Sequence, residues 1–446
     1  MTASRTLPER PPFTLRARVL TPLASRGTRF EPDGLVAVDA DGRIASVGPA
    51  DGQADAIDGA IDLRPLVVLP GLVDLHAHLP QLPNAGLGAG LHLLTWLKRY
   101  IFPLEREFDD AEAAEHLAPA AFRAFAAAGT TTALMYGAVF APSLDAAFRA
   151  AEAHGIRAII GKVMMDRVTY DESIDPATIL ETSLRQSADL CDRWHGADDG
   201  RLGYAFTPRF AVSCTMDMLR ESAALARSKG AWWQTHVSED QTEIAEVRRL
   251  FPEARDYVDV YDRAGGLGER TILAHAIHLS GRELARLVET GTRVAHCPAS
   301  NLFLASGMMP LARYRQAGLF LGLGSDVSAG PELSIFAAMR AGAFTQSALH
   351  AAGDTRPVLR PLEWLRIATL GGARVLGLGK VIGSIEVGKE ADLIAVDPRL
   401  TAPIPGLETP EAEDLVSRLM FRPHPDMVRA AWVRGRRLEG PPGLLS

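Results

Sequence analysis

Short apolar runs alternate with helical segments along most of this chain, and this alternation limits its possible folds more than any other feature. The runs have the length of buried strands. Patterns typical of helices, such as those at 113–128 and 282–290, separate them. There are eight runs, at 69–78, 129–137, 157–165, 202–210, 232–239, 271–280, 293–298 and 319–326. Eight buried strands with intervening helices predict an α/β fold, the (β/α)8 TIM-type barrel. A doubly wound sheet is the less favoured alternative, because no G-x-G-x-x-G follows the first run.

Both ends of the chain have a different, β-rich texture. Segments 13–22 and 34–50 alternate in the manner of strands, and Asp41-Gly42 within the second is a strong hairpin signal. Segments 382–398 and 427–438 repeat this style near the C-terminus. We therefore expect the two ends to fold together beside the barrel.

The length of the chain fits this division. Its 446 residues are enough for a barrel of about 250 residues or more and a smaller unit. We predict a catalytic barrel over residues 69–380. Residues 1–68 and 381–446 are expected to form one small β-sandwich.

Composition excludes several classes of partner. The net charge is −7 and no block of Lys or Arg stands out, which argues against a nucleic-acid footprint or a polybasic membrane patch. The three cysteines form no C-x-x-C pair, as expected in a reducing compartment. The N-terminus shows no apolar signal-peptide region, and no uncharged apolar run reaches the roughly 18 residues of a membrane span. We expect a cytoplasmic protein that binds neither nucleic acid nor membrane.

The first apolar run ends in a pair of histidines, His76 and His78. Side chains two apart on a strand point to the same side, so both imidazoles can be directed at one point. Barrel active sites lie at this end of the strands, and imidazole is a good ligand for Zn or Fe. Taken alone, the pair could equally be satisfied histidines of the core.

Three later runs end in residues of the same chemical kind. His236 lies near the end of the fifth run, three residues before Glu239, His275 lies within the sixth run, and Asp326 ends the eighth run. Each is a metal-ligand or acid–base type at the position where a barrel places its chemistry. Such residues at four strand ends are much harder to attribute to chance than one histidine pair.

With these residues the chain resembles the amidohydrolase superfamily and, within it, the guanine deaminases, over roughly residues 65 to 395. The H-x-x-E spacing from His236 to Glu239 and the segment HCPASN are similar to those of metal-dependent deaminases in this superfamily. Features closer to guanine deaminases are PQ at 80–81, LLTWLKRYIFPLE from Leu93, GTTTA from Gly129, GKVMMDR from Gly161, TPRF from Thr207 and ATLGGARVLGL from Ala368.

This resemblance implies a set of roles. The metal ligands would be His76, His78, His236 and Asp326, and catalysis would involve Glu239, His275 and Asp326. The implied cofactor is one divalent metal ion per chain, with zinc ahead of iron. A second ion is not expected, because the fourth run ends in TPRF without the lysine that two-metal relatives use there, and Lys162 is expected to be structural. The implied reaction is hydrolytic deamination of guanine to xanthine and ammonia, in a homodimer.

Substrate contacts are expected from Gln81, Arg209 and Phe210, together with His236 and Glu239. The Gln81 amide has a donor and an acceptor end that can match one edge of a purine. Arg209 carries a fork of donors suited to a carbonyl, and Phe210 could lie against the ring face. In the alternative interpretation, Arg209 pairs with a surface carboxylate and Phe210 belongs to the core.

Other functions stay open on the same residues. Thr95 and Val168 stand where guanine deaminases usually have an acidic residue and an asparagine, so an oxidised purine, a pterin or an s-triazine is an alternative substrate. A non-catalytic barrel scaffold is a more remote alternative. The compact zinc deaminases are excluded because the chain has no P-C-x-x-C. His278 and His296 are expected near the site without binding the metal, and Cys297 is expected to pack in the core.

Overall fold

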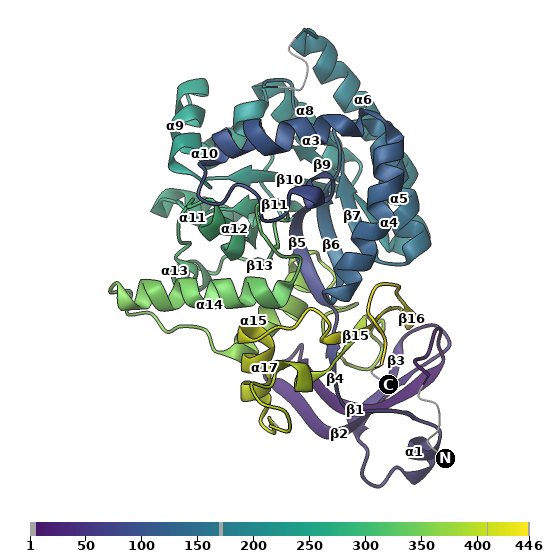
Figure 1. Cartoon of the computed structure of the whole chain (residues 1–446). Helices are drawn as coiled ribbons and strands as arrows, with labels where there is room; N and C mark the ends of the chain where they lie inside the picture. The colour runs from purple at the N-terminus through teal and green to yellow at the C-terminus, as the bar shows by residue number, and fades with distance from the viewer. Residues whose placement is uncertain (1–5, 169–172, 408, 445–446) are drawn as a thin grey trace.

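The computed structural model describes residues 6–168, 173–407 and 409–444. Within them, a barrel of parallel strands is surrounded by helices, and a second sheet built from both ends of the chain lies beneath it in Figure 1. The predicted fold class, a TIM-type barrel beside a β unit formed by the two termini, is confirmed.

The barrel strands follow the eight apolar runs. Their hydrogen-bonded order is β13-β12-β11-β10-β9-β7-β6-β5, and β8 (Val163–Met164) pairs with β9 beside this path. Two backbone bonds join the ends of the path, from Asp326 N to the His76 carbonyl at 2.7 Å and from His78 N to the Val327 carbonyl at 2.9 Å. The strands are β5 (Leu72–His78), β6 (Thr130–Tyr136), β7 (Arg157–Gly161), β9 (Leu202–Pro208), β10 (Trp232–Val237), β11 (Thr271–His275), β12 (Arg293–His296) and β13 (Leu321–Leu323).

Helices fill the connections, and their ends follow local sequence signals. The helix α11 begins at a capping box, in which Ser280 and Glu283 satisfy each other's backbone N–H, and it ends at Gly291 in the left-handed region. The helices of the barrel are α2 (Leu93–Trp96), α3 (Phe102–Arg106), α4 (Ala111–Ala127), α5 (Ala141–His154), α6 (Pro176–Trp194), α7 (Ala197–Gly200), α8 (Met216–Ser228), α9 (Gln241–Leu250), α10 (Tyr257–Arg263), α11 (Gly281–Thr290), α12 (Pro298–Phe303), α13 (Leu311–Gln316), α14 (Ile335–Ala351), α15 (Pro361–Arg366) and α16 (Gly372–Val375).

Short 3-10 and π-helical segments complete this framework. They are η1 (Leu79–Asn84), η2 (Leu97–Ile101), η3 (Glu107–Asp109), η4 (Ala211–Ser213), η5 (Ile367–Gly371) and η6 (Pro398–Thr401). Of these, η2 and η5 are π-helical, and η2 leads directly into α3. Wide turns of this kind are frequent near functional sites.

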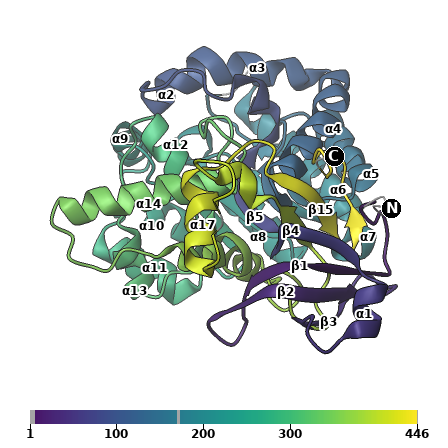
Figure 2. The ribbon, with the colours of Figure 1, turned by 60° about the horizontal axis from the view of Figure 1, so that its bottom comes forward.

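The two ends of the chain meet in one seven-stranded sheet. Its order is β16-β15-β14-β4-β1-β2-β3, so C-terminal strands pair directly with N-terminal ones. Figure 2 shows this sheet against the barrel, with α17 (Ala412–Phe421) beside it. The strands are β1 (Phe13–Pro22), β2 (Thr28–Val38), β3 (Ile44–Pro49), β4 (Ile61–Pro70), β14 (Leu393–Val396), β15 (Val428–Val433) and β16 (Arg436–Arg437), and α1 (Ala54–Asp58) precedes β4. The predicted hairpin at Asp41-Gly42 joins β2 to β3.

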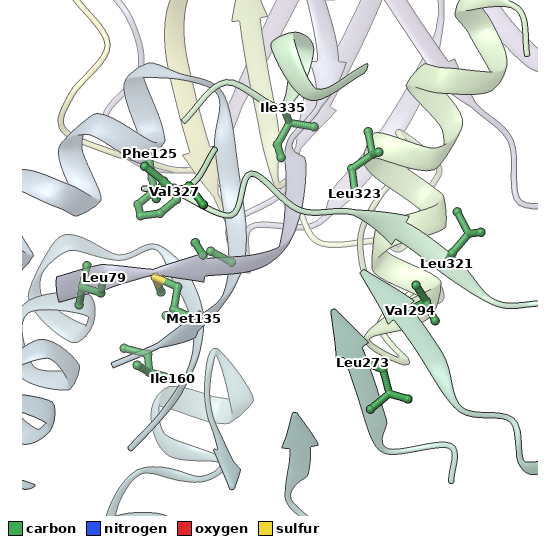
Figure 3. Packing of buried hydrophobic residues seen from close by; sticks show 14 of the residues in the cluster. Leu79, Phe125, Met135, Ile160, Leu273, Val294, Leu321, Leu323, Val327 and Ile335 are labelled. Carbon is green, nitrogen blue, oxygen red and sulfur yellow. The ribbon is translucent and has the colours of Figure 1, made fainter. Parts of the chain in front are cut away.

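Buried side chains on the barrel strands divide between two sides. Met135, Ile160 and Leu273, labelled in Figure 3, belong to the buried cluster that also contains side chains of the surrounding helices. Their neighbours Leu134 and Ile159 belong to a separate buried cluster. This alternation follows from the period of two along a strand, and it closes the lower barrel with apolar groups. Polar side chains at the other end of the strands are therefore collected above a solid floor.

Charged side chains join the barrel to the terminal sheet. The buried Arg157 on β7 donates to Asp392 at 3.1 Å and to Glu390 at 2.6 Å, just before β14. Arg434, after β15, donates to the same Glu390 at 2.9 Å. Because charged pairs this buried are costly to break, they fix the two parts against each other.

Two further features concern the rest of the chain. The cysteines Cys191, Cys214 and Cys297 are all buried and free of disulfides. In the described ranges, no helix combines the length and apolar character needed to cross a membrane.

Candidate active site

Three histidines and one aspartate converge at the carboxyl ends of the barrel strands. The Nε2 atoms of His76 and His78, on β5, lie 3.2 Å apart, and the Nε2 atom of His236, on β10, lies 3.3 Å from that of His78. The Oδ1 atom of Asp326 lies 3.1 Å from His76 Nε2 and 3.3 Å from His78 Nε2. All four side chains are buried. The structure thus directs four ligand atoms from three segments toward one point.

This cluster fits a divalent metal ion. Metal–ligand bonds of about 2.0–2.1 Å in a tetrahedron place the ligand atoms roughly 3.3 Å apart, close to the observed separations. The Nδ1 atom of His236 lies 2.6 Å from the Arg209 carbonyl oxygen, which can only accept. Nδ1 therefore carries the hydrogen, and Nε2 directs its lone pair into the cluster. His76, His78 and His236 form a group whose ligand atoms could hold an ion.

Burial keeps these ligands in the protonation states that a metal requires. It lowers the pKa of His76 to about 4, and together with the neighbouring His76 and His78 it lowers the pKa of His236 well below its ordinary value. Burial acts against ionisation of Asp326, but His76, His78 and His275 outweigh it and hold the pKa of that carboxyl well below its usual range. His76 and His236 are therefore neutral imidazoles, and Asp326 is an ionised carboxylate, at neutral pH.

Unusual backbone geometry positions two of the site residues. His275 and Asp326 have φ angles of 70° and 50°, in the left-handed region that side chains other than glycine seldom occupy. His275 is the last residue of β11, and Asp326 lies three residues past the end of β13, so the left-handed turn redirects each side chain at or after a strand end. Strain of this kind persists only where the surroundings impose it, and it is concentrated at functional sites.

Glu239 and His275 lie beside the histidine cluster. The Oε2 atom of Glu239 is 3.4 Å from His275 Nε2, and its Oε1 atom accepts a hydrogen bond of 3.2 Å from Ser306 Oγ. His275 Nε2 is also 3.7 Å from Asp326 Oδ2, and its Nδ1 atom is 2.9 Å from Asn301 Oδ1. Burial and the nearby charge of Asp326 raise the pKa of Glu239 well above its usual range. A carboxyl group in this state can carry a proton at neutral pH.

A cavity of about 380 Å³ opens over these groups. Its wall includes the cluster members His78, His236 and Asp326, and it also includes Glu239 and His275. Leu93, Trp96, Leu97 and Leu304 supply an apolar wall. The mixed lining, apolar with a few convergent polar groups, is typical of a small-molecule site.

All five residues predicted to contact substrate line this cavity: Gln81, Arg209, Phe210, His236 and Glu239. Gln81 lies on η1, and Arg209 and Phe210 follow β9. Each is almost fully buried. Phe210 also belongs to the main apolar cluster of the barrel, so both interpretations drawn from the sequence apply to it.

Arg209 has a carboxylate partner that the sequence interpretation did not place in the site. Its Nη1 donates to Glu105 Oε2 at 2.6 Å, and Gln81 Nε2 donates to Glu105 Oε1 at 2.7 Å. This partner is a buried carboxylate rather than one at the surface, because Glu105 is only 4% exposed. Glu105 is the last letter of LLTWLKRYIFPLE, so the motif contained it without revealing its contacts.

The other residues considered from the sequence lie outside the ligand cluster. Lys162 is buried, with Nζ 3.4 Å from both the Val163 carbonyl oxygen and Ser183 Oγ. His278 is half-buried and contacts the Ser306 carbonyl oxygen at 2.8 Å. His296 is buried at the end of β12, and burial lowers its pKa to about 3.

Two departures from the usual guanine deaminase pattern lie at exposed positions. Thr95 is exposed on α2 and Val168 is 41% exposed. Neither lines the cavity among the residues that the structure describes.

Comparison with known proteins agrees with this geometry. The model of the amidohydrolase family matches residues 67–438. This chain belongs to the amidohydrolase family. Membership accounts for a barrel whose strand ends carry the histidines and the aspartate, and the matched residues include every member of the site.

Similar members of the family carry a more specific name. The guanine deaminase of Escherichia coli strain K12 is 37% identical over 395 residues, which are 88% of this chain and 87% of that protein. A solved structure of E. coli guanine deaminase aligns with a TM-score of 0.88 and 33% identity, covering 96% of this chain and 99% of the other. The guanine deaminase of C. acetobutylicum with guanine bound in its active site aligns with a TM-score of 0.87 and 27% identity over the same shares.

Proposed function

We propose that this chain is a guanine deaminase, which hydrolyses guanine to xanthine and ammonia. The observation that carries the proposal is one cavity in which a metal-ligand cluster, a buried carboxyl group and donors suited to a purine meet. The named relatives, which match most of the chain, support the same activity.

We propose that His76, His78, His236 and Asp326 hold a single divalent cation, zinc ahead of iron. Three imidazoles and one carboxylate suit either ion. A cation bound there lowers the pKa of a coordinated water, so that a nucleophile is available at neutral pH. Lys162 supports a single ion, because its contacts are with Val163 and Ser183 rather than with the cluster.

Glu239 and His275 are the proposed proton-transfer groups. Glu239 holds a proton in its buried carboxyl group and donates it to the ring nitrogen beside C2, which makes that carbon electrophilic. Asp326 is ionised before the reaction and accepts a proton from the attacking water. His275 Nε2 lies between Glu239 and Asp326 and orients the groups at the reacting carbon. C2 gains oxygen from water, the amino group takes the proton held by Asp326 and leaves as ammonia, and the hydroxyl on C2 returns a proton to Glu239 as the carbonyl forms.

Gln81, Arg209 and Phe210 are the proposed substrate contacts. Phe210 lies against the ring, and Arg209 offers donors to the ring carbonyl, which adenine lacks. The oxidised purines, pterins and s-triazines that the sequence left open share an amino-substituted ring. They are the competing substrates that the assay below must separate.

The cellular location, the oligomeric state and the domain boundaries of the enzyme are also proposed. We infer a cytoplasmic homodimer, on the grounds of the free cysteines and the family resemblance. We place the domain boundaries at 1–68, 69–380 and 381–446.

Ammonia release from a panel of amino-heteroaromatics tests the function. Purified protein loaded with zinc is incubated with guanine, adenine, 8-oxoguanine, a pterin and an s-triazine. Guanine should give the highest kcat/KM, with xanthine appearing in equal amount. A site that hydrogen-bonds the carbonyl should disfavour adenine by about 10⁴-fold. Faster turnover of another member of the panel would assign the activity to that compound instead.

A further inference from the structure

The carboxylate of Glu105 connects the two polar residues that are expected to read the substrate. It comes from α3, while Gln81 is on η1 and Arg209 follows β9. One oxygen accepts from Gln81 Nε2 at 2.7 Å and the other accepts from Arg209 Nη1 at 2.6 Å. Both contacts are buried. The bond to Arg209 joins two opposite charges, whereas the Gln81 donor is neutral, so the bond to Arg209 is the stronger of the two.

These contacts determine which way the Gln81 amide points. The two ends of an amide look alike, and its orientation is assigned from its hydrogen bonds. A carboxylate paired with a guanidinium only accepts, so the end of Gln81 that faces Glu105 must be the NH2 group. The amide carbonyl then faces the other way. Gln81 lines the cavity, and no described residue donates to its Oε1 atom.

We propose that Glu105 is a positioning residue that fixes Gln81 with its carbonyl oxygen toward the substrate. The inference rests on the proposed function and adds the chemistry of the recognised edge. The cavity offers an acceptor from Gln81 beside the donors of Arg209. This pair of an acceptor and a donor is complementary to a ring edge on which an N–H donor lies next to an acceptor.

The neutral isostere Glu105→Gln should reverse this orientation. Arg209 requires an acceptor, so the new amide turns its oxygen to Arg209 and its NH2 group to Gln81. Gln81 must then rotate to offer its own oxygen to that NH2 group. Its NH2 group then faces the cavity. There, two hydrogen-bond donors, this NH2 group and the ligand N–H, face each other without an acceptor.

The exchanged variant Gln81→Glu with Glu105→Gln should restore the acceptor. The amide introduced at position 105 still accepts from Arg209 and donates its NH2 group to the carboxylate introduced at position 81. The second oxygen of that carboxylate faces the cavity, as the Gln81 carbonyl did. The total charge of the pair is unchanged, so the exchange separates orientation from charge.

Binding of hypoxanthine tests the inference without turnover. This purine has the ring carbonyl and the ring N–H groups of guanine but no amino group to lose. Its dissociation constant is measured by calorimetry for the zinc-loaded wild type, Glu105→Gln and the exchanged variant. Asp259→Asn is the matched control, because Asp259 is a buried carboxylate on α10 that accepts from Arg255 and Arg263 and does not line the cavity.

We expect Glu105→Gln to weaken hypoxanthine binding by about ten-fold or more, the size of a lost hydrogen bond with an unpaired donor left behind. The exchanged variant should recover most of that loss, and the control should bind as the wild type does. Equal affinity in Glu105→Gln and wild type would overturn the proposal, as would an exchanged variant no better than Glu105→Gln.

Two safeguards keep the result interpretable. If Glu105→Gln does not fold, hypoxanthines methylated at N1, N7 or N9 are tested on the wild type, and undiminished binding of all three would refute an N–H contact to Gln81. If the wild type neither binds hypoxanthine nor releases ammonia from guanine, the proposed function fails. Failure of the Glu105 inference alone leaves wild-type turnover intact.

Discussion

Removal of the buried charge of Lys162 should stabilise this protein in a way that depends on pH. The side chain is 1% exposed, and its Nζ atom contacts a carbonyl and a hydroxyl oxygen rather than any carboxylate of the described residues. Burial lowers the pKa of Lys162 from 10.5 to about 7. The unfolded chain therefore binds a proton at Lys162 that the folded chain binds poorly between pH 7 and pH 10.5.

The magnitude follows from linkage. A group whose pKa is lower in the folded state destabilises that state wherever the unfolded state alone is protonated, so the free energy of unfolding rises with pH across this window. A shift from 10.5 to about 7 corresponds to a cost of about 4 kcal/mol at pH 7 and about 2 kcal/mol at pH 9. Lys162→Met removes the titrating group and keeps most of the apolar stem.

The assay is urea unfolding of the two proteins at pH 7 and pH 9. Lys162→Met should be more stable than the wild type at pH 7, and this advantage should shrink by about 2 kcal/mol at pH 9. Lys380→Met, at an exposed position, is the control and should show no such change. A Lys162→Met advantage that is equal at the two pH values would refute the linkage argument, because a packing effect alone does not titrate.

Three further predictions concern the site. Purified protein should carry about one divalent metal ion per chain by elemental analysis. Chelation should abolish turnover, and zinc should restore it. Two tightly bound ions per chain would exclude the single-ion site. Glu239→Gln should keep that ion, but its turnover should fall by about 10²- to 10⁴-fold. His236→Ala should lose the ion as well as turnover. Near-normal turnover of Glu239→Gln would show that Glu239 takes no part in the reaction. Arg209→Ala should lower kcat/KM for guanine by about 10²-fold or more, given a charge-assisted contact, with the fold checked by circular dichroism; unchanged kcat/KM would show that Arg209 does not bind the substrate.

Strand periodicity accounts for what the sequence could predict. The eight runs became the eight barrel strands because each is short, apolar and bounded by polar turns. The positions of His76 and His236 followed from the same pattern, since barrel chemistry lies at the carboxyl ends of strands. The sequence therefore predicted which residues form each strand and at which end of the strand the functional residues lie.

Contacts between segments that are distant in the chain could not be predicted from strand periodicity. Glu105 and Arg209 are separated by 104 positions in the chain, and only the packing of α3 against the segment after β9 brings them together. The pairing of β4 with β14 depends similarly on both ends of the chain folding against one face. Periodicity fixes which residues are buried, but it does not determine which buried residues of separate elements meet.

Closure of the barrel and assembly of the site are one event. The bonds that close the strand path run between β5 and the segment after β13, and they involve His76, His78 and Asp326 themselves. The left-handed turn at Asp326 places its carboxylate over the histidine pair only when that closure forms. A chain that failed to close would separate the ligands by whole strands. The sequence could identify each ligand, but their common point exists only in the closed barrel.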